Sequence, residues 1–313
     1  MDASVIIPTH NRSEWVLRAV DALFRQDYPP DSFEVLISCD RCTDGTEESL
    51  RSSFGGRLKV VKSDVPGQPG ALNTGLKYAR GHLAIFLDDE LEAEEGFVSA
   101  HVRAHRAEPA AKIAVTGYSP VIIDSSSTPY TRMVARDYEN YFTELARPRR
   151  KSAPTDLCGC NFSLPLSAFR EVGGFNERYL RNDFELAVRL LQLGYEIRFC
   201  AAARANQRIA ITADMIIGRT RERAQNDCQL AREYSWCVPY LPFYRVLANP
   251  SVRRRWRVLW ETCGVASGLF RAMRRVRPEN LRLANLEYAA RYCYGLREEV
   301  GDWRGFRRLA QRN

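Results

Sequence analysis

Long uninterrupted apolar stretches are absent from this 313-residue sequence. No window approaches the roughly 18 apolar residues that a membrane-spanning helix needs, and the best candidate, 259–273, is short and bounded by arginines. The amino terminus, MDASVIIPTHNR, lacks the long hydrophobic core and the small-residue cleavage site of an export signal. These absences predict a cytoplasmic protein, soluble or peripheral at the inner face of the cell membrane.

Histidine is scarce, with four residues that all precede position 106. His101 and His105 have the spacing of neighbours on one helix face, but they lack the glutamate of a zinc-protease motif. We therefore expect an ordinary surface pair.

Cysteine is present in an odd number, nine residues scattered along the chain. Without an export signal this pattern favours reduced thiols over a disulfide framework. A zinc site built from Cys39-x-x-Cys42 and Cys158-x-Cys160 is a minor alternative, because the spacing of the second pair is unusual.

The basic surplus of the chain lies wholly in its C-terminal part. Residues 245–313 hold sixteen arginines and six acidic residues, net +10, whereas the whole chain carries +8, so residues 1–244 sum to −2. Two interpretations of 252–277 remain open: a basic amphipathic helix that docks on an anionic membrane, or a helix packed on the rest of the protein with a solvated arginine face. No nucleic-acid-binding motif accompanies the arginines, so nucleic acid is not expected as a partner. The apolar residues near helical spacing are Val252, Trp256, Leu259, Trp260, Cys263, Phe270 and Met273.

Strand and helix patterns alternate through the first ninety residues. Apolar, partly β-branched runs predict strands, and the segments between them carry apolar residues at helical spacing. Four such units in ninety residues predict a parallel sheet flanked by helices. The predicted strands are 3–7, 33–38, 58–62 and 83–87, and the predicted helices are 13–26, 46–54 and 70–79.

The remaining sequence is less regular. Residues 113–116 and 121–123 read as strands, 125–131 as a loop, and 183–193 as a helix after glycine-rich turns at 158–161 and 173–174. From 212 onward the pattern is mostly helical, with prolines at 239, 242 and 250 as breaks. The fold class predicted is α/β with a helical C-terminal extension.

Polar residues concentrate where the first strands end. Ligands of open α/β sheets bind outside the carboxyl ends of the strands, so the loops 8–12, 38–45 and 88–90 are expected to share one rim. Asp88-Asp89-Glu90 ends a strand and offers the oxygen ligands that Mg²⁺ or Mn²⁺ prefers beside a diphosphate. The alternative is a solvated acidic turn leading into further glutamates.

Four other polar residues allow two interpretations each. Asp40 follows a strand and could accept a hydrogen bond from a base or ribose, although turn residues of this kind are common. Asp44 fits the turn reading better. Asn73 could approach a diphosphate or cap a helix. Asp183 could act as a general base in a cleft or complement the dipole of the helix that it opens.

Taken together, these segments resemble the family 2 glycosyltransferases, which have the GT-A fold. The match covers about residues 3–205, and the ordered set is specific although each motif alone is weak. It consists of Val5-Ile6-Ile7-Pro8-Thr9-His10-Asn11-Arg12, Asp40-Arg41-Cys42-Thr43-Asp44-Gly45-Thr46, Ala71-Leu72-Asn73-Thr74-Gly75-Leu76, Ala79-Arg80-Gly81, Asp88-Asp89-Glu90, Gly159-Cys160-Asn161-Phe162 and Gly173-Gly174-Phe175-Asn176-Glu177.

The resemblance implies an inverting transfer of a sugar from a nucleoside-diphosphate sugar to a hydroxyl of a glycan, a lipid-linked acceptor or a small aglycone. It implies that residues 1–107 bind the sugar donor, 108–211 bind the acceptor, and 212–313 form a basic helical extension. Asp183 would be the general base, and Asp88, Glu90 and Gln207 would hold Mg²⁺ or Mn²⁺. The residues implied at the nucleotide-sugar site are Pro8, Thr9, Asn11, Arg12, Asp40, Asn73, Asp88 and Asp89.

Departures from the family pattern bear mainly on the metal. Glu90 stands where the family usually has the second aspartate of its Asp-x-Asp motif, and Asn182 stands where it has a glutamate before the aspartate that aligns with Asp183. Gln207 or Asn206 lies near the position where many members have a metal-binding histidine. These changes predict weak metal affinity. They also leave open a noncatalytic relative that only binds a nucleotide sugar.

Overall fold

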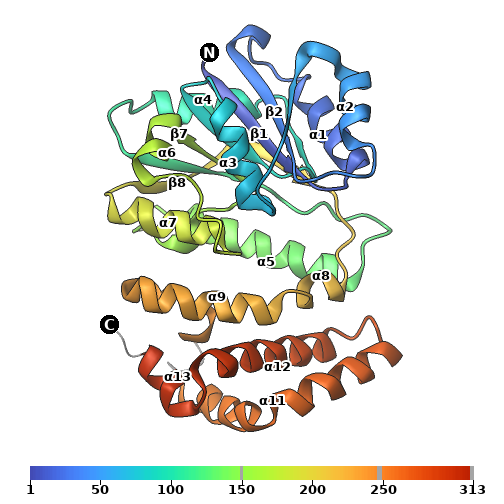
Figure 1. Ribbon diagram of the computed structural model, residues 1–313, viewed down its shortest axis with the longest axis vertical. Helices are drawn as coiled ribbons and strands as arrows, with labels where there is room; N and C mark the ends of the chain where they lie inside the picture. Colours follow the sequence, from blue (N-terminus) through green and yellow to red (C-terminus); the bar gives the residue numbers. More distant parts are fainter. Residues whose placement is uncertain (149–150, 245–248, 311–313) are drawn as a thin grey trace. The chain divides into compact units, whose positions relative to one another are not determined.

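A computed structural model of the chain describes residues 1–148, 151–244 and 249–310 (Figure 1). The chain divides into two compact units. The first comprises Met1–Ile122, Ala135–Arg178 and Asn182–Ile209, and the second comprises Ile123–Val134, Tyr179–Arg181 and Ala210–Asn313.

The amino-terminal half of the first unit is built from the predicted strand–helix repeats. Strands β1 (Ala3–Thr9), β2 (Phe33–Cys39), β3 (Lys59–Lys62) and β4 (Leu83–Leu87) pair in parallel in the order β3-β2-β1-β4. Helices α1 (Ser13–Leu23), α2 (Thr46–Phe54) and α3 (Gln68–Tyr78) connect them, with short 3₁₀ turns at Pro30–Ser32 and Gly55–Arg57. The predicted parallel sheet is confirmed.

The same sheet continues into a mixed part that the sequence only partly predicts. Strand β7 (Asn161–Pro165) runs antiparallel to both β4 and β6 (Ile113–Tyr118), β8 (Glu196–Gln207) is parallel to β6, and β5 (Leu91–Ala93) is antiparallel to β8. The full order is β3-β2-β1-β4-β7-β6-β8-β5. Only β5 and β7 oppose the common direction, so the predicted α/β fold with a mostly parallel sheet is confirmed.

Two predictions for the middle of the chain are wrong. Residues 121–123 form no strand, because only Val121 makes an isolated bridge, to Gln207. The expected loop at 125–131 runs into a long helix, α5 (Pro129–Leu145).

The prediction that Pro250 breaks a helix is also wrong, because Pro250 begins one, as Pro129 begins α5. Proline is tolerated at the first position of a helix, where its missing N–H would have no partner within the helix.

Alternating side chains of the strands supply two cores, one on each face of the sheet. Val5 and Ile7 pack with apolar residues of α1 and of α4 (Phe97–Arg106). Ile6 and Phe86 face the other way, toward α3, α6 (Leu166–Val172) and α7 (Asn182–Gln192). Phe86 stacks on Phe162 with ring centroids 4.6 Å apart, and burying one such side chain stabilises the fold by about 1.5–3 kcal/mol. These cores hold the strand ends rigidly at the rim.

The second unit is helical, as predicted for the C-terminal region. Its core contains stacked Trp260 and Phe306, with centroids 5.1 Å apart, and a fully buried Glu287 paired with Arg274 at 2.8 Å. No described helix combines the length and apolar content needed to cross a membrane. The helices are α8 (Ala213–Ile217), α9 (Thr220–Glu233), α11 (Pro250–Val276), α12 (Leu281–Val300) and α13 (Trp303–Ala310), with a 3₁₀ segment at Ser235–Tyr240 (Figure 1).

Candidate active site

The carboxyl ends of β1, β2 and β4 meet at one edge of the sheet. The Asp40 N–H donates to the Thr9 carbonyl at 2.8 Å, and the Thr9 hydroxyl donates to Asp89 Oδ2 at 2.7 Å. Asn11 Oδ1 accepts from the Thr43 N–H at 2.7 Å. The prediction that loops 8–12, 38–45 and 88–90 share a rim is confirmed, because these bonds join all three.

Arg12 balances part of the acidic cluster that follows β4. Its guanidinium lies 2.7 Å from Asp89 Oδ1 and 2.9 Å from Glu90 Oε2. Burial works against the charged form of Arg12, yet the charges of Asp89 and Glu90 raise its pKa overall. Burial also raises the pKa of Asp89, and Arg12 and Thr9 offset part of that effect. Asp89 is only 4% exposed, so the solvated-turn interpretation is wrong for this residue.

Asp88 lies among the other carboxylates of the rim. Desolvation by the surrounding protein raises its pKa well above the ordinary value, and the nearby charges of Glu90, Asp89 and Asp183 add to the increase. Gln68 Nε2 donates a hydrogen bond to Asp88 Oδ1 at 2.9 Å. A cation bound here would relieve this repulsion, as expected of a site that holds a divalent metal against a diphosphate.

Gln207, the last residue of β8, faces the acidic cluster. Its pairing opposite Leu91 brings the Gln207 amide to Glu90, to which Nε2 donates a hydrogen bond. Its Oε1 is buried and has no hydrogen-bond partner among the described residues. A buried amide oxygen costs free energy unless something coordinates it. This oxygen therefore fits the ligand preference of Mg²⁺ or Mn²⁺.

The metal would depend on amide as well as carboxylate oxygens. Within the described ranges, no three histidine, cysteine or acidic side chains are arranged to hold a metal ion. That finding also gives the alternative zinc site no support, although Cys158 Sγ and Cys160 Sγ lie 3.4 Å apart.

Asp183 stands in the first turn of α7, on the same side of the first unit as Asp88. Its Oδ2 accepts from the Gly159 N–H at 3.3 Å and its Oδ1 from the Phe184 N–H at 2.8 Å. The next residue, Cys160, accepts from the Asp88 N–H at 3.0 Å through its carbonyl, so the segment 159–160 brings Asp88 and Asp183 to one place. The charge of Asp183 accordingly contributes to the raised pKa of Asp88. Its place in the first turn also suits the helix dipole, and the two interpretations of Asp183 are compatible.

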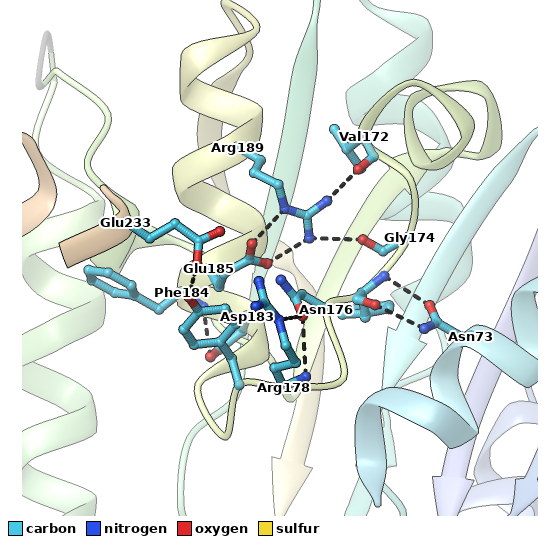
Figure 2. Close-up of polar contacts among 12 residues, drawn as sticks. Asn73, Val172, Gly174, Asn176, Arg178, Asp183, Phe184, Glu185, Arg189 and Glu233 are labelled. Carbon is cyan, nitrogen blue, oxygen red and sulfur yellow. Dashed lines mark hydrogen bonds and ion pairs between the residues drawn. The ribbon is translucent and has the colours of Figure 1, made fainter. Parts of the chain in front are cut away.

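A buried ion pair fixes the helix that carries Asp183. Glu185, fully buried, binds Arg189 at 2.7 Å, and Arg189 also donates to the carbonyl oxygens of Val172 and Gly174 (Figure 2). The loop before α7 is thereby tied to the helix itself.

The side chain of Asn73 links two distant segments of the first unit. It lies inside α3, whose N-cap is Gly67, so the helix-capping interpretation is wrong. Its Oδ1 accepts from the Phe175 N–H at 2.8 Å, and its Nδ2 donates to the Phe175 carbonyl at 2.9 Å (Figure 2). The same Nδ2 donates to Glu177 at 2.9 Å. The amide joins α3 to the loop at 174–177, a non-local contact that local sequence patterns do not reveal.

The other polar candidates hold the rim together. Asp40 is 8% exposed and accepts from the Gly67 N–H at 2.8 Å, so its side chain does not close a local turn. Asp44 accepts from the Thr46 N–H at 3.1 Å, which confirms its turn role. Pro8 is buried within β1, opposite Ser38 of β2.

Three residues near Asp88 and Asp183 are not predicted from the sequence: Gln68, Tyr138 and Tyr141. Gln68 follows Gly67, and this glycine-containing turn is the feature of the sequence that could have indicated a residue of the site. Tyr138 has a strongly raised pKa, first because of Cys160 and then because of burial, with Asp88 among the further causes. Burial and then Cys158 raise the pKa of Tyr141, and Asp183 contributes. Both tyrosines belong to α5, which the sequence did not predict.

His101 lies inside the protein and His105 is half-buried, so the expectation of a surface pair is wrong. His101 is 0% exposed, with Nδ1 2.8 Å from Ser163 Oγ and Nε2 3.0 Å from Asn161 Oδ1. Burial lowers the pKa of His101 to about 3 and that of His105 to about 4. The pair is a neutral structural element between α4 and β7.

This sheet order and acidic rim define a GT-A type glycosyltransferase fold, and solved structures agree. The mannosyltransferase PcManGT from Pyrobaculum calidifontis, solved with GDP-Man and Mn²⁺, superposes with a TM-score of 0.63 at 18% identity over 95% of this chain and 86% of that one. S. aureus TarS gives a TM-score of 0.53 at 15% identity, covering 95% of this chain and 54% of its own.

The family follows from the sequence comparison. The family model "Glycosyl transferase family 2" matches residues 4–173, and the chain belongs to that family. Similar curated proteins include the probable glycosyltransferase YdaM of Bacillus subtilis, 28% identical over 64% of this chain and 49% of its own. The validoxylamine A glucosyltransferase of Streptomyces hygroscopicus subsp. limoneus is 29% identical over 60% of this chain and 47% of its own. The chain spans about half the length of these relatives.

Proposed function

We propose that the protein is an inverting glycosyltransferase that moves a sugar from a nucleoside-diphosphate sugar to an acceptor hydroxyl. The observation that carries the proposal is that Asp88, at the end of β4, and Asp183, at the start of α7, both bind the segment 159–160. The Asp88 N–H donates to the Cys160 carbonyl at 3.0 Å, and the Gly159 N–H donates to Asp183 Oδ2 at 3.3 Å. A sugar held between a diphosphate at Asp88 and a base at Asp183 would be attacked from the side opposite its leaving group.

The sugar donor would lie along the rim of the first three loops. Thr9 and Asp40 would contact the nucleotide, and Asp88 and Asp89 the ribose and diphosphate. Arg12 is supported as part of this site because it holds Asp89 and Glu90 in place. Pro8, Asn11 and Asn73 would contribute by shaping the surrounding loops, since the side chains of Asn11 and Asn73 already bind backbone groups there.

A divalent cation would be held by Asp88, Glu90 and Gln207. The raised pKa of Asp88 and the unpartnered Gln207 oxygen support this assignment. Bound Mg²⁺ or Mn²⁺ would supply Lewis-acid stabilisation of the departing nucleoside diphosphate.

The bond changes balance in a single displacement. Asp183 takes the proton of the acceptor hydroxyl while the hydroxyl oxygen forms a bond to the anomeric carbon. The bond from that carbon to the diphosphate oxygen breaks, and the nucleoside diphosphate leaves with the electron pair. Because attack and departure are in line, the configuration inverts.

Residues 1–107 would form the donor-binding half and 108–211 the acceptor-binding half. The acceptor would be a glycan, a lipid-linked molecule or a small aglycone. Relatives named for validoxylamine A and for poly(ribitol-phosphate) support keeping this range broad. The proposed site of action is the cytoplasm, with peripheral association at the inner face of the cell membrane.

A panel of UDP-, GDP- and dTDP-sugars, first ranked by thermal shift with Mn²⁺, tests the proposal. Bound ligands stabilise the folded state with the logarithm of their concentration over the dissociation constant. The best sugar donor is then incubated with acceptors, and the anomeric configuration of the product is read by NMR. We expect inverted product. Retained configuration would refute the mechanism, and donor binding without any metal-dependent transfer or hydrolysis would favour the noncatalytic alternative.

A further inference from the structure

Helix α11 has two apolar faces, and only one of them is buried. Trp260 and Cys263 are 2% and 0% exposed, within the core of the second unit. On the opposite side, Val258, Val265 and Leu269 are 65%, 81% and 56% exposed. Positions seven and four residues apart fall on one side of an α-helix, so these residues form one stripe. The stripe consists of Val258, Val265, Leu269, Met273 and Val276.

Arginines gather at both ends of this exposed stripe. Pro250–Val276 contains seven arginines and one acidic residue, Glu261, for a net charge of +6, and no arginine falls between Arg257 and Arg271. Arg254, Arg257 and Arg275 are exposed and lie beside the stripe in the helical projection. Within the described part of the chain, these three arginines form no ion pair.

The distribution of charge along α11 indicates which partner binds the exposed stripe. A second copy of the helix would bring arginine ends against arginine ends in either a parallel or an antiparallel pairing, which is repulsive. Anionic lipid headgroups complement both ends, and the apolar middle matches the headgroup–acyl boundary. A helix of 27 residues, about 40 Å long, would lie along the surface.

We propose that the stripe Val258–Val276 and its flanking arginines bind the surface of an anionic membrane, with α11 parallel to the bilayer. The stripe enters the headgroup region while the arginines pair with lipid phosphates. This binding needs neither a sugar donor nor a metal, so its test is independent of the glycosyltransferase reaction.

Sedimentation of the full-length protein with vesicles tests this proposal. We expect binding to vesicles of equal parts phosphatidylcholine and phosphatidylglycerol, weakened by salt, and little binding to phosphatidylcholine alone. The double variant Arg254→Gln/Arg257→Gln should bind roughly 30-fold more weakly, since each basic residue near the surface contributes about fivefold. The variant Val265→Asn/Leu269→Gln should lose at least about tenfold, because it removes the apolar contact without changing charge.

Matched controls separate the stripe from general effects. Arg103→Gln/Arg136→Gln removes the same charge from exposed positions of α4 and α5, and Leu193→Gln removes an exposed apolar side chain after α7. Both should bind like the wild type, and circular dichroism should show every variant folded. Equal binding to neutral vesicles, equal loss in the controls, or no binding to anionic vesicles would overturn the proposal. So would a dimer in light scattering that the stripe variant converts to a monomer, because the face would then belong to a second copy.

Discussion

Gly159 and Asp183 are in direct contact: the Gly159 N–H donates to Asp183 Oδ2 at 3.3 Å, and a Cβ added at Gly159 would lie 2.9 Å from both Cβ and Oδ2 of Asp183. Real Cβ atoms do not approach that closely, so any side chain at 159 would displace the carboxylate. Position 159 therefore controls where the proposed base stands.

Gly159→Ala should lower kcat by roughly 10- to 100-fold with a small change in KM for the sugar donor. A displacement of about 1 Å of a reacting group can cost that much. Steady-state kinetics provide the measurement. Gly56→Ala is the matched control, because a Cβ there meets nothing within 4 Å. An unchanged kcat in Gly159→Ala would contradict the positioning role.

Gln207→His should tighten Mn²⁺ binding by about tenfold, because it restores the metal-binding histidine that the family resemblance implies near this position. Electron paramagnetic resonance of free Mn²⁺, titrated in the presence of nucleoside diphosphate, measures the affinity. Asn206→His is the control, since the Asn206 side chain contacts Glu94 and Arg204 instead of Glu90. If both variants tighten binding equally, Gln207 is not at the metal.

Asp88→Asn should raise the Tm of the metal-free protein and remove its stabilisation by Mn²⁺ with nucleoside diphosphate. The pKa of Asp88 is raised in the folded state, so ionisation costs stability as the pH rises above the unfolded value. The advantage of the variant should thus be absent at low pH and present at neutral pH. Each kcal/mol relieved is worth roughly 2–4 °C. A variant less stable than wild type at neutral pH would contradict this account.

His101 should make the protein acid-sensitive. Its pKa is lowered to about 3, so the unfolded chain binds a proton more readily and stability falls as the pH decreases below about 6.5. At pH 5 the cost is about 2 kcal/mol. Urea unfolding at pH 7 and pH 5 measures it, and His101→Gln, which keeps a polar side chain, should lose less stability over that range. Equal pH dependence in the two proteins would refute the assignment.

The sequence predicts the elements whose signals are local. The runs 3–7 and 83–87 are apolar and bounded by turn residues, so β1, β4 and the acidic rim follow from periodicity and topology. Strand β5 has only three residues, and β7 (Asn161–Pro165) contains asparagine, serine and proline in place of an unbroken apolar run, so neither carries a clear strand signal. Sheet pairing, which acts between distant segments, determines them.

Side-chain environments were the least predictable part of the site. Asn73 binds a loop about a hundred residues away, and His101 is buried by β7. The residues next to Asn73 and His101 in the sequence indicate neither the contact of Asn73 nor the burial of His101. Tyr138 and Tyr141 stayed unnoticed because the start of α5 is rich in serine, threonine and proline, which favours a loop.

The central claim is that Asp88 and Asp183 serve one nucleotide sugar, with Asp183 as the base, and Asp183→Asn tests it most directly. We expect kcat to fall by roughly 10²- to 10⁴-fold while the dissociation constant of the sugar donor with Mn²⁺ changes little. Asp137→Asn, an exposed carboxylate on α5, should leave both values unchanged. Turnover by Asp183→Asn at the wild-type rate would contradict the account.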